Sequence, residues 1–243
     1  MFVTILARRN RVNYITDIQQ HGFAVLEPVL DPDRIDNLLQ EIARIENVSN
    51  LRAGIRNVLN VAPSIRTLAN SDPFRSIVGS ILGDEARVVR GIYFDKHKDA
   101  NWKVLWHQDL TIAVRERVDV DGYGPWSLKA GIQHVQPPVS ILRDMLTLRL
   151  HLDDTDETNG ALRVLPGSHA RGRLAASEIE SWKQNRPAVV CAVKKGGLMI
   201  MKPLLVHSSH STVTSRHRRV LHLEYSGADL PAGLEWFEER AKQ

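Results

Sequence analysis

Two side chains that can bind a metal ion stand two residues apart in the segment Trp106–Leu110. His107 supplies an imidazole and Asp109 a carboxylate. In an extended strand, residues two apart point to the same face and lie roughly 6 to 7 Å apart along the chain. An imidazole and a carboxylate are two parts of the 2-His-1-carboxylate set, which holds non-haem Fe(II) and leaves the opposite face of the metal open. The pair therefore predicts a metal centre that needs one more histidine.

The sequence contains two other His-x-Asp pairs, His97 with Asp99 and His151 with Asp153. His97 lies in a charged, loop-like stretch that lacks the apolar wall a metal pocket requires. His151 lies in a strand-like run, but too few residues follow it before the best partner histidine for a sheet to form between them. The pair that begins at His107 is therefore the stronger prediction.

The predicted second histidine is His207, which follows three apolar residues about 100 positions beyond His107. The spacing leaves enough chain for a sheet that brings the two together. A core histidine bonded to a backbone carbonyl is the structural alternative. Three further histidines, His210, His217 and His222, lie close enough in sequence to be rivals, and we interpret them as structural or solvated.

A carboxylate bound beside the metal would need a planar cation at its far end, and a guanidinium binds a carboxylate through two parallel hydrogen bonds. Arg218 begins the next predicted strand, 11 residues after His207. Arg219 is the alternative, because strand parity does not tell which of the two points inward. Ser209 shares a strand face with His207, so its hydroxyl could reach the same carboxylate.

The composition limits the class of protein. A chain of 243 residues with a formal charge of +4 is long enough for one packed domain, and its basic residues are scattered. Only Ser215–Arg219 resembles a nucleic-acid patch. The single cysteine, Cys191, excludes an intrachain disulfide. The apolar run Phe2–Ala7 precedes its arginines, the reverse of a signal peptide, and no stretch reaches membrane-spanning length. We expect a soluble, cytoplasmic protein without nucleic-acid or membrane partners.

Helices are predicted in the first third of the chain, over about 14–83. One begins at Asp31 and another at Asp72, each with proline at the first helical position. Apolar residues recur at helical spacing after both starts. The second helix is expected to end at Gly83.

Short strands are predicted in the rest of the chain. Alternating patterns and apolar runs place them at Val88–Phe94, Val104–Leu110, Thr147–Asp153, Ala161–Pro166, Val189–Val193, Leu198–Met201, Leu204–His210 and Arg218–Tyr225. The polar turn 156–160 predicts a hairpin, and the tail Leu234–Lys242 predicts a charged helix. Helices followed by many short strands favour a mainly β fold with flanking helices. We expect a double-stranded β-helix, a cupin-like jelly roll, over about 86–226.

The segment of about 111–145 has no clean period and is rich in glycine and proline. Structureless segments of this length in compact domains are usually functional. We interpret it as a lid over a substrate, with Trp126, Lys129 and His134 as its contact residues.

Three pieces of sequence, in this order, resemble the phytanoyl-CoA dioxygenase family of Fe(II)/2-oxoglutarate oxygenases. They are Trp106–Leu110, Asn159–His169 and Pro203–Ser209, with Arg218 beyond. The opening Gly22–Leu26, which precedes a helix, is similar too. The resemblance extends over roughly 14–226 and implies that residues 1–243 form a single oxygenase domain.

Carried over residue by residue, the resemblance implies His107, Asp109 and His207 as iron ligands. It implies that Arg218 binds the distal carboxylate of 2-oxoglutarate with the help of Ser209. The implied cofactors are Fe(II), 2-oxoglutarate and O2.

The activity that the resemblance implies is hydroxylation of an unactivated C–H bond of a small molecule, with decarboxylation of 2-oxoglutarate to succinate and CO2. The presence of Asp109 favours hydroxylation over the related halogenation. Arg149 and Arg56 are further candidates to contact 2-oxoglutarate or substrate. Two other classes stay open, a cupin-type enzyme that uses another metal without 2-oxoglutarate and a non-catalytic jelly-roll binding protein. Substrate identity and oligomeric state are not predicted.

Overall fold

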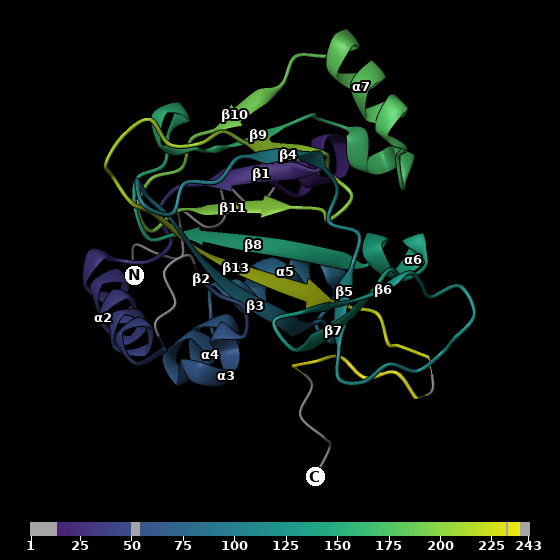
Figure 1. The fold of residues 1–243 in the computed structure, drawn as a ribbon, viewed down its shortest axis with the longest axis horizontal. Helices are drawn as coiled ribbons and strands as arrows, with labels where there is room; N and C mark the ends of the chain where they lie inside the picture. Colours follow the sequence, from purple (N-terminus) through teal and green to yellow (C-terminus); the bar gives the residue numbers. More distant parts are fainter. Residues whose placement is uncertain (1–13, 50–53, 232, 239–243) are drawn as a thin grey trace.

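Antiparallel sheets make up most of the computed structural model, which describes residues 14–49, 54–231 and 233–238 (Figure 1). The expectation for the charge order of the amino terminus falls on residues outside these ranges. The six-stranded sheet contains, in spatial order, β1 (Phe23–Leu26), β11 (Leu198–Met201), β8 (Met145–His151), β13 (Arg218–Ser226), β3 (Arg87–Lys96) and β2 (Gly54–Ile55). The four-stranded sheet contains β10 (Val189–Cys191), β9 (Leu162–Val164), β12 (His207–Ser209) and β4 (Val104–His107).

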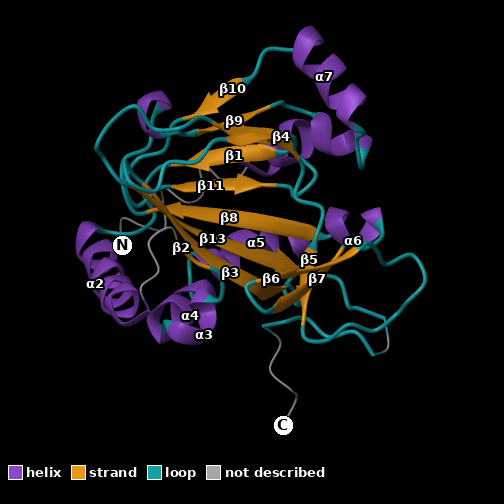
Figure 2. Ribbon diagram, viewed as in Figure 1, coloured by secondary structure: helices purple, strands orange, loops and turns teal. Residues whose placement is uncertain are grey.

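These two sheets face each other across a cavity whose lining comes from β3, β8 and β13 on one side and from β4, β9 and β12 on the other (Figure 2). Two antiparallel sheets around one interior are the jelly-roll arrangement that the sequence predicted. The mainly β architecture with flanking helices is therefore confirmed.

Helices cover the outer face of the six-stranded sheet. They are residues 14–21, α2 (Pro32–Ser49), α3 (Val58–Val61), α4 (Pro63–Ala69) and α5 (Phe74–Leu82). The predicted start of α2 is confirmed, because Asp31 Oδ1 accepts a hydrogen bond of 2.8 Å from the Arg34 amide. The helix α5 ends at Gly83 as predicted, where φ is 88° and only glycine is unstrained. None of the helices in the described residues is both long and apolar enough to cross a membrane.

The alternation of side chains along β8 and β13 separates a packing face from a chemical face. Leu148 and Leu221 are fully buried against the helices in the largest hydrophobic cluster. Arg149, Arg218 and His222 belong to the opposite parity and line the cavity between the sheets. The inner face of the larger sheet therefore carries the charges.

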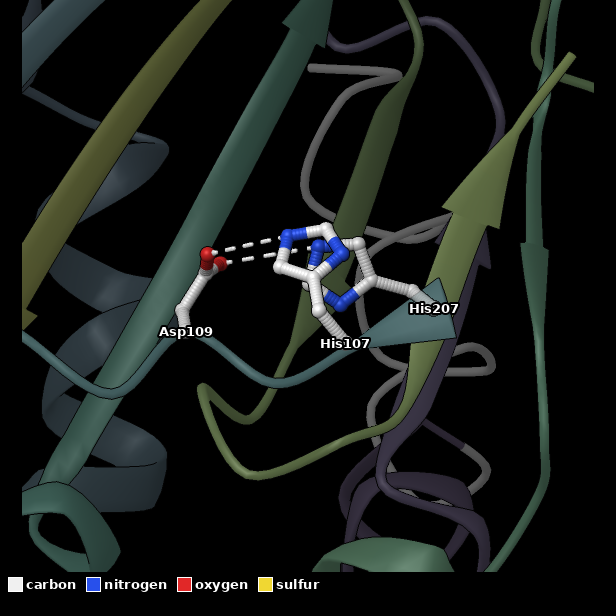
Figure 3. Close-up of side chains that lie close together, drawn as sticks. All are labelled: His107, Asp109 and His207. Atoms are coloured by element: carbon white, nitrogen blue, oxygen red, sulfur yellow. Dashed lines mark ion pairs between the residues drawn. The ribbon is translucent and has the colours of Figure 1, made fainter. Parts of the chain in front are cut away.

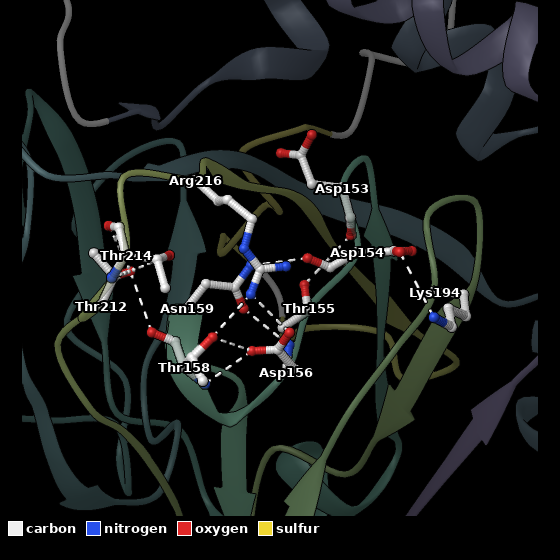
Figure 4. A network of polar contacts seen from close by, with 10 residues as sticks. All are labelled: Asp153, Asp154, Thr155, Asp156, Thr158, Asn159, Lys194, Thr212, Thr214 and Arg216. Atoms are coloured by element: carbon white, nitrogen blue, oxygen red, sulfur yellow. Dashed lines mark hydrogen bonds and ion pairs between the residues drawn. The ribbon is translucent and has the colours of Figure 1, made fainter.

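The predicted hairpin at 156–160 is wrong, because β8 and β9 lie in different sheets. The turn crosses from one sheet to the other through a short 3-10 helix, Glu157–Asn159, which Asp156 caps. Polar contacts then tie this turn to the loop before β13 (Figure 4). Arg216 donates to Asp156 Oδ2 and to Thr158 Oγ1, each at 2.8 Å. These contacts hold the loop that leads into Arg218.

The segment of about 111–145 has more regular structure than its sequence suggested. It contains a three-stranded sheet of β5 (Ile112–Val114), β7 (Ile132–Val135) and β6 (Trp126–Lys129), followed by α6 (Val139–Arg143). Helix α7 (Ala176–Asn185) and the 3-10 helix Ser168–Arg171 complete the fold. The function of the segment as a lid stays a prediction.

The predicted helix over Leu234–Lys242 is wrong for its described part, 234–238. Trp236 is 1% exposed and forms an isolated β-bridge with Val114. Burial of a large aromatic ring against the three-stranded sheet outweighs the helical preference of the charged neighbours. The rest of the predicted helix lies outside the described residues.

Candidate metal centre

The structure brings His107, Asp109 and His207 together. Their possible ligand atoms all lie within 4.8 Å of one another. The two histidines stand directly opposite each other, because β4 and β12 pair in a register that aligns them. Their ring centroids are 4.3 Å apart and the carboxylate of Asp109 faces both rings (Figure 3).

Both imidazoles are held in one tautomer by the backbone carbonyl two residues before them. Nδ1 of His107 lies 2.8 Å from the Leu105 carbonyl, and Nδ1 of His207 lies 2.9 Å from the Leu205 carbonyl. A carbonyl oxygen only accepts, so each Nδ1 carries the proton. Each Nε2 therefore presents its lone pair to the space in front of Asp109, as in a metal ligand whose orientation a backbone carbonyl fixes.

The carboxylate of Asp109 does not come from the strand, and the prediction that the strand continues to Leu110 is wrong. β4 ends at His107, and the Asp109 amide donates to the Pro203 carbonyl at 3.0 Å. The cause is Gln108, whose buried side chain donates to two backbone carbonyls at 2.7 Å and accepts from the Leu174 amide at 2.8 Å. This three-way anchor pulls the chain out of the sheet and turns Asp109 toward both histidines.

The prediction for the strand of His207 is wrong in a similar way. β12 contains only His207–Ser209, and residues 204–206 lie outside any strand. The Leu204 carbonyl is one of the two acceptors of the Gln108 amide. The segment before His207 is therefore bound to the glutamine that follows His107.

The electrostatics of the triad suit a cation. Burial lowers the pKa of His207 to about 4, so its imidazole is neutral and its Nε2 is free to coordinate. Burial acts to raise the pKa of Asp109, but the adjacent His207 and His107 outweigh burial and hold that pKa below its ordinary value. Burial acts to lower the pKa of His107, but the neighbouring Asp109 carboxylate outweighs burial and raises that pKa above its ordinary value. The centre therefore presents one negative carboxylate, the neutral imidazole of His207 and an imidazole of His107 that a cation would have to compete for with a proton.

The donor set fits a divalent metal ion. Nε2 of His107 and of His207 each lie 3.7 Å from an Asp109 oxygen, too far for a hydrogen bond. Two metal–ligand bonds of about 2.1 Å together reach about 4.2 Å, so one ion could join atoms at this separation. Oδ2 of Asp109 is buried and has no hydrogen-bond partner among the described residues. Two histidines and one carboxylate are the ligands of non-haem Fe(II) sites.

Beside the triad lies a cavity of about 220 Å³. Most residues predicted for cofactor or substrate binding line it, together with residues that the sequence did not single out. The predicted ones are His107, Asp109, His207, Ser209, Arg218, Arg149, Arg56 and Lys129. Trp126 and His134 do not line this cavity, and their contact with substrate stays a prediction.

Arg218 and Ser209 line one end of this cavity, and a second buried cation, Lys96, is bound to Ser209 there. Arg218 is 3% exposed, Lys96 is 0% exposed, and the two are paired residues on β13 and β3. Lys96 Nζ donates to Ser209 Oγ and to the His210 carbonyl, both at 2.8 Å. Nε and Nη1 of Arg218 are buried without a partner among the described residues. We call Lys96, Ser209 and Arg218 the deep end of the cavity.

The structure distinguishes Arg218 from its sequence alternative. Arg219 points to the other face of β13, where it donates to both oxygens of Asp153 at 2.8 and 2.6 Å. Arg218 lines the cavity and forms no ion pair with the residues that the structure describes. Of the two arginines, only Arg218 lies where it could bind a ligand beside the triad.

Lys96 was missed because the predicted strand ended at Phe94, which placed the lysine in a solvated loop. β3 instead runs to Lys96, and Arg90, Ile92 and Phe94 on the same face line the cavity. The period-two spacing of Arg90, Ile92, Phe94 and Lys96 was the available signal. Burial and the charges of Arg218 and Arg149 lower the pKa of Lys96 to about 7.

A second charged row crosses the middle of the larger sheet. Arg149 donates to Nδ1 of His222 at 2.7 Å, and Nε2 of His222 donates to Glu224 at 3.0 Å. Arg90 also donates to Glu224, at 3.2 Å. His222 therefore lies between a cation and a carboxylate, with both of its nitrogens used.

Comparison with known proteins agrees with this geometry. The model of the family described as phytanoyl-CoA dioxygenase (PhyH) matches residues 18–220. Phytanoyl-CoA dioxygenase 1 of Oryza sativa subsp. japonica is 24% identical over 174 residues, which are 68% of this chain and 52% of the rice protein. The chain thus spans about half the length of this curated relative.

Solved structures share the fold at low sequence identity. The non-haem alpha-ketoglutarate-dependent carbocyclase SnoK from nogalamycin biosynthesis has a TM-score of 0.69 and 15% identity, with 88% of this chain and 82% of that chain covered. EctD from S. alaskensis, solved with 2-oxoglutarate and 5-hydroxyectoine, has a TM-score of 0.67 and 19% identity, with 87% and 74% covered. These likenesses establish the jelly-roll fold.

Proposed function

The chain belongs to the phytanoyl-CoA dioxygenase family, and we propose that it is a non-haem Fe(II)/2-oxoglutarate-dependent dioxygenase. Its proposed reaction is hydroxylation of an unactivated C–H bond of a small molecule. The single observation that carries the proposal is the convergence of His107, Asp109 and His207, with an unpartnered Asp109 oxygen, beside a cavity that ends in buried cations.

The three residues of the triad would hold Fe(II). The Nε2 atoms of His107 and His207 and the carboxylate of Asp109 are the donors, and the Leu105 and Leu205 carbonyls keep both rings in the coordinating tautomer. When bound, Fe(II) with 2-oxoglutarate and O2 supplies oxidation of the substrate, coupled to decarboxylation of 2-oxoglutarate to succinate and CO2. The role of the protein is to hold, orient and enclose the reactants.

The deep end would bind the distal carboxylate of 2-oxoglutarate. Two buried cations side by side are unfavourable unless an anion joins them. Arg218 offers Nε and Nη1, and Lys96 has used two of its three N–H groups on Ser209 and on the His210 carbonyl. Ser209 accepts from Lys96, so its own hydroxyl proton is available to a carboxylate oxygen.

Arg149 would act near the metal. Its cation faces Asp109 and its N–H group is fixed on His222. Nε of Arg149 is buried without a partner among the described residues. Nε is therefore a buried donor that could bind a ligand oxygen in the middle of the cavity.

Hydroxylation is the type of oxidation that we propose. Asp109 stands in the position of the carboxylate ligand, which favours hydroxylation over halogenation. The solved structures that share this fold include one described as a carbocyclase. Identification of the reaction product would therefore distinguish hydroxylation from ring formation.

Anaerobic spectroscopy tests the proposal. Fe(II) and 2-oxoglutarate are added to metal-free protein, and the weak visible charge-transfer band of the chelate is recorded. We expect the band in the unchanged protein and in His21→Ala, whose histidine is exposed at the end of the first helix. We expect no band in His107→Ala. No band in folded, iron-loaded protein would instead favour a cupin that uses another metal or a binding module.

A further inference from the structure

The cavity has a second group of cations, at the end away from Arg218. Arg56 follows β2, Lys129 ends β6, and Arg90 lies on β3 between the two sheets. Each of the three lines the cavity. We call Arg56, Arg90 and Lys129 the outer end.

Of the two acidic residues that line the cavity, only Glu224 forms an ion pair with this group, and it does so with Arg90. Glu224 already accepts from Arg90 and from His222. Asp109 is a proposed metal ligand. Among the residues that the structure describes, no carboxylate forms an ion pair with Arg56 or with Lys129, and the contact that Lys129 makes is with Thr111 Oγ1 at 3.2 Å.

The cations of the outer end act on one another. Partial burial lowers the pKa of Lys129 from its ordinary value, and the charges of Arg90 and Arg56 lower it further. His134, which lies near Arg90 and Lys129, is neutral and adds no charge to this group. Burial lowers the pKa of His134 to about 4, and its Nε2 is buried without a partner in the described part of the chain. An oxyanion between Arg56 and Lys129 would relieve this repulsion.

One molecule of 2-oxoglutarate cannot serve both ends. Lys96 lies six positions after Arg90 on β3, and six steps along an antiparallel strand span roughly 20 Å. The end carbons of a five-carbon dicarboxylate are only about 5 Å apart, given four bonds of about 1.5 Å each. A co-substrate held at Arg218 therefore leaves the outer end empty.

We propose that the substrate of this protein carries an anionic oxygen group, a carboxylate or a phosphate, that binds between Arg56 and Lys129 at the outer end. This inference rests on the proposed function, because it assigns the deep end to 2-oxoglutarate. The carbon to be oxidised would then lie between the bound anion and the triad. Arg90 would keep its ion pair with Glu224 and would attract the anion through its positive charge.

The test uses inorganic phosphate as the probe of the outer end. Full-length protein is loaded anaerobically with Fe(II) and saturating 2-oxoglutarate, so that the deep end is filled. Phosphate is then titrated by calorimetry while the visible band is recorded. We expect one phosphate per chain. We expect phosphate binding to weaken at least tenfold in the double variant Arg56→Gln/Lys129→Gln, since charge-assisted hydrogen bonds are lost.

A matched double variant controls for the loss of two positive charges. Arg44 and Lys98 are exposed, and neither lines the cavity. Arg44→Gln/Lys98→Gln is expected to bind phosphate as the unchanged protein does. Failure of phosphate to bind, or equal affinity in the Arg56→Gln/Lys129→Gln variant, would overturn the inference while a normal band leaves the proposed function standing.

Absence of the band would overturn the proposed function instead. The outer end is then tested in metal-free Arg218→Gln protein, in which the deep end has lost its guanidinium. Phosphate binding that still depends on Arg56 and Lys129 would support an anion site there. Binding that does not depend on them would overturn it.

Discussion

The two ends of the cavity carry similar charges in different surroundings. At the deep end, Lys96 and Arg218 are 0% and 3% exposed and stand on paired strands of the larger sheet. At the outer end, Arg56 is exposed and Lys129 is half-buried on a separate small sheet. Interactions between buried charges are screened less by water and salt than those between exposed charges.

The difference indicates two kinds of recognition. A buried site on paired strands fixes one anion of constant shape, which suits a co-substrate. A partly exposed site, built beside an edge strand and on the 111–145 segment, suits a substrate, which can differ from one member of the family to another. Changes at the deep end should therefore have larger effects on ligand affinity than changes at the outer end.

Removal of the metal centre between the two ends should have the largest effect. Asp109→Ala eliminates the negative donor and leaves two neutral imidazoles. We expect Fe(II) affinity to fall more than about 100-fold, beyond the 10- to 100-fold typical of outer partners of a ligand. Iron titration under anaerobic conditions measures the change.

The control for this change is Asp99→Ala, which alters another His-x-Asp pair in an exposed loop. Its iron affinity should equal that of the unchanged protein. Equal iron binding in Asp109→Ala and Asp99→Ala would contradict the assignment of the triad.

Gln108→Leu should have the next largest effect. The substitution keeps the approximate volume but leaves two carbonyls and one amide, those of Gly172, Leu204 and Leu174, without their partner. At about 1 kcal/mol for each lost contact, the free energy of unfolding should fall by about 3 kcal/mol. Fe(II) affinity should fall about tenfold, because Asp109 loses its orientation.

Denaturant unfolding and iron titration measure these two quantities. Gln184→Leu, an exposed change on α7, serves as the control and should alter neither. A Gln108→Leu protein with unchanged iron affinity would show that the glutamine does not position the carboxylate.

The pH dependence of 2-oxoglutarate affinity should also distinguish the deep end from the outer end. The expected change is smaller than those of the substitutions above. The pKa of Lys96 is about 7 in the ligand-free protein, because burial and two neighbouring arginines oppose its charge. Binding of an anion favours the charged form, so 2-oxoglutarate should bind with uptake of a proton above pH 7. Affinity should therefore fall as the pH rises from 7 to 8.5, by up to about tenfold per pH unit.

Lys96→Met is the variant that isolates this effect. Its affinity for 2-oxoglutarate should be lower than that of the unchanged protein at pH 6.5 and nearly constant up to pH 8.5. A steep pH dependence that survives in Lys96→Met would assign the titration to another group.

The sequence predicted the features that depend on local pattern. The start of α2 at Asp31, the existence of strands β8 and β13, and the pairing of His107 with His207 followed from spacing and turn chemistry. Strand parity alone could not tell whether Arg218 or Arg219 faces inward, because both faces of β13 are covered. The ion pair of Arg219 with Asp153 decides this, and Asp153 lies in the bend that follows β8.

The features that the sequence did not predict depend on contacts between distant segments. The anchor of Gln108 uses backbone groups more than 60 residues away. The burial of Lys96 depends on Ser209 and on the pairing of β3 with β13. The bridge of Trp236 to Val114 likewise needs the three-stranded sheet to be present first. Apart from the period-two spacing that ends at Lys96, such contacts leave no periodic signal near the residue itself.

The central claim is that the deep end holds 2-oxoglutarate and the outer end does not. The most direct test is anaerobic titration of 2-oxoglutarate into iron-loaded Arg218→Gln and Arg56→Gln proteins, followed by the visible band. We predict that Arg218→Gln raises the dissociation constant about 100-fold, equivalent to about 2.7 kcal/mol, and that Arg56→Gln changes it less than about twofold. Equal weakening in the two variants, or weakening in Arg56→Gln alone, would contradict the account.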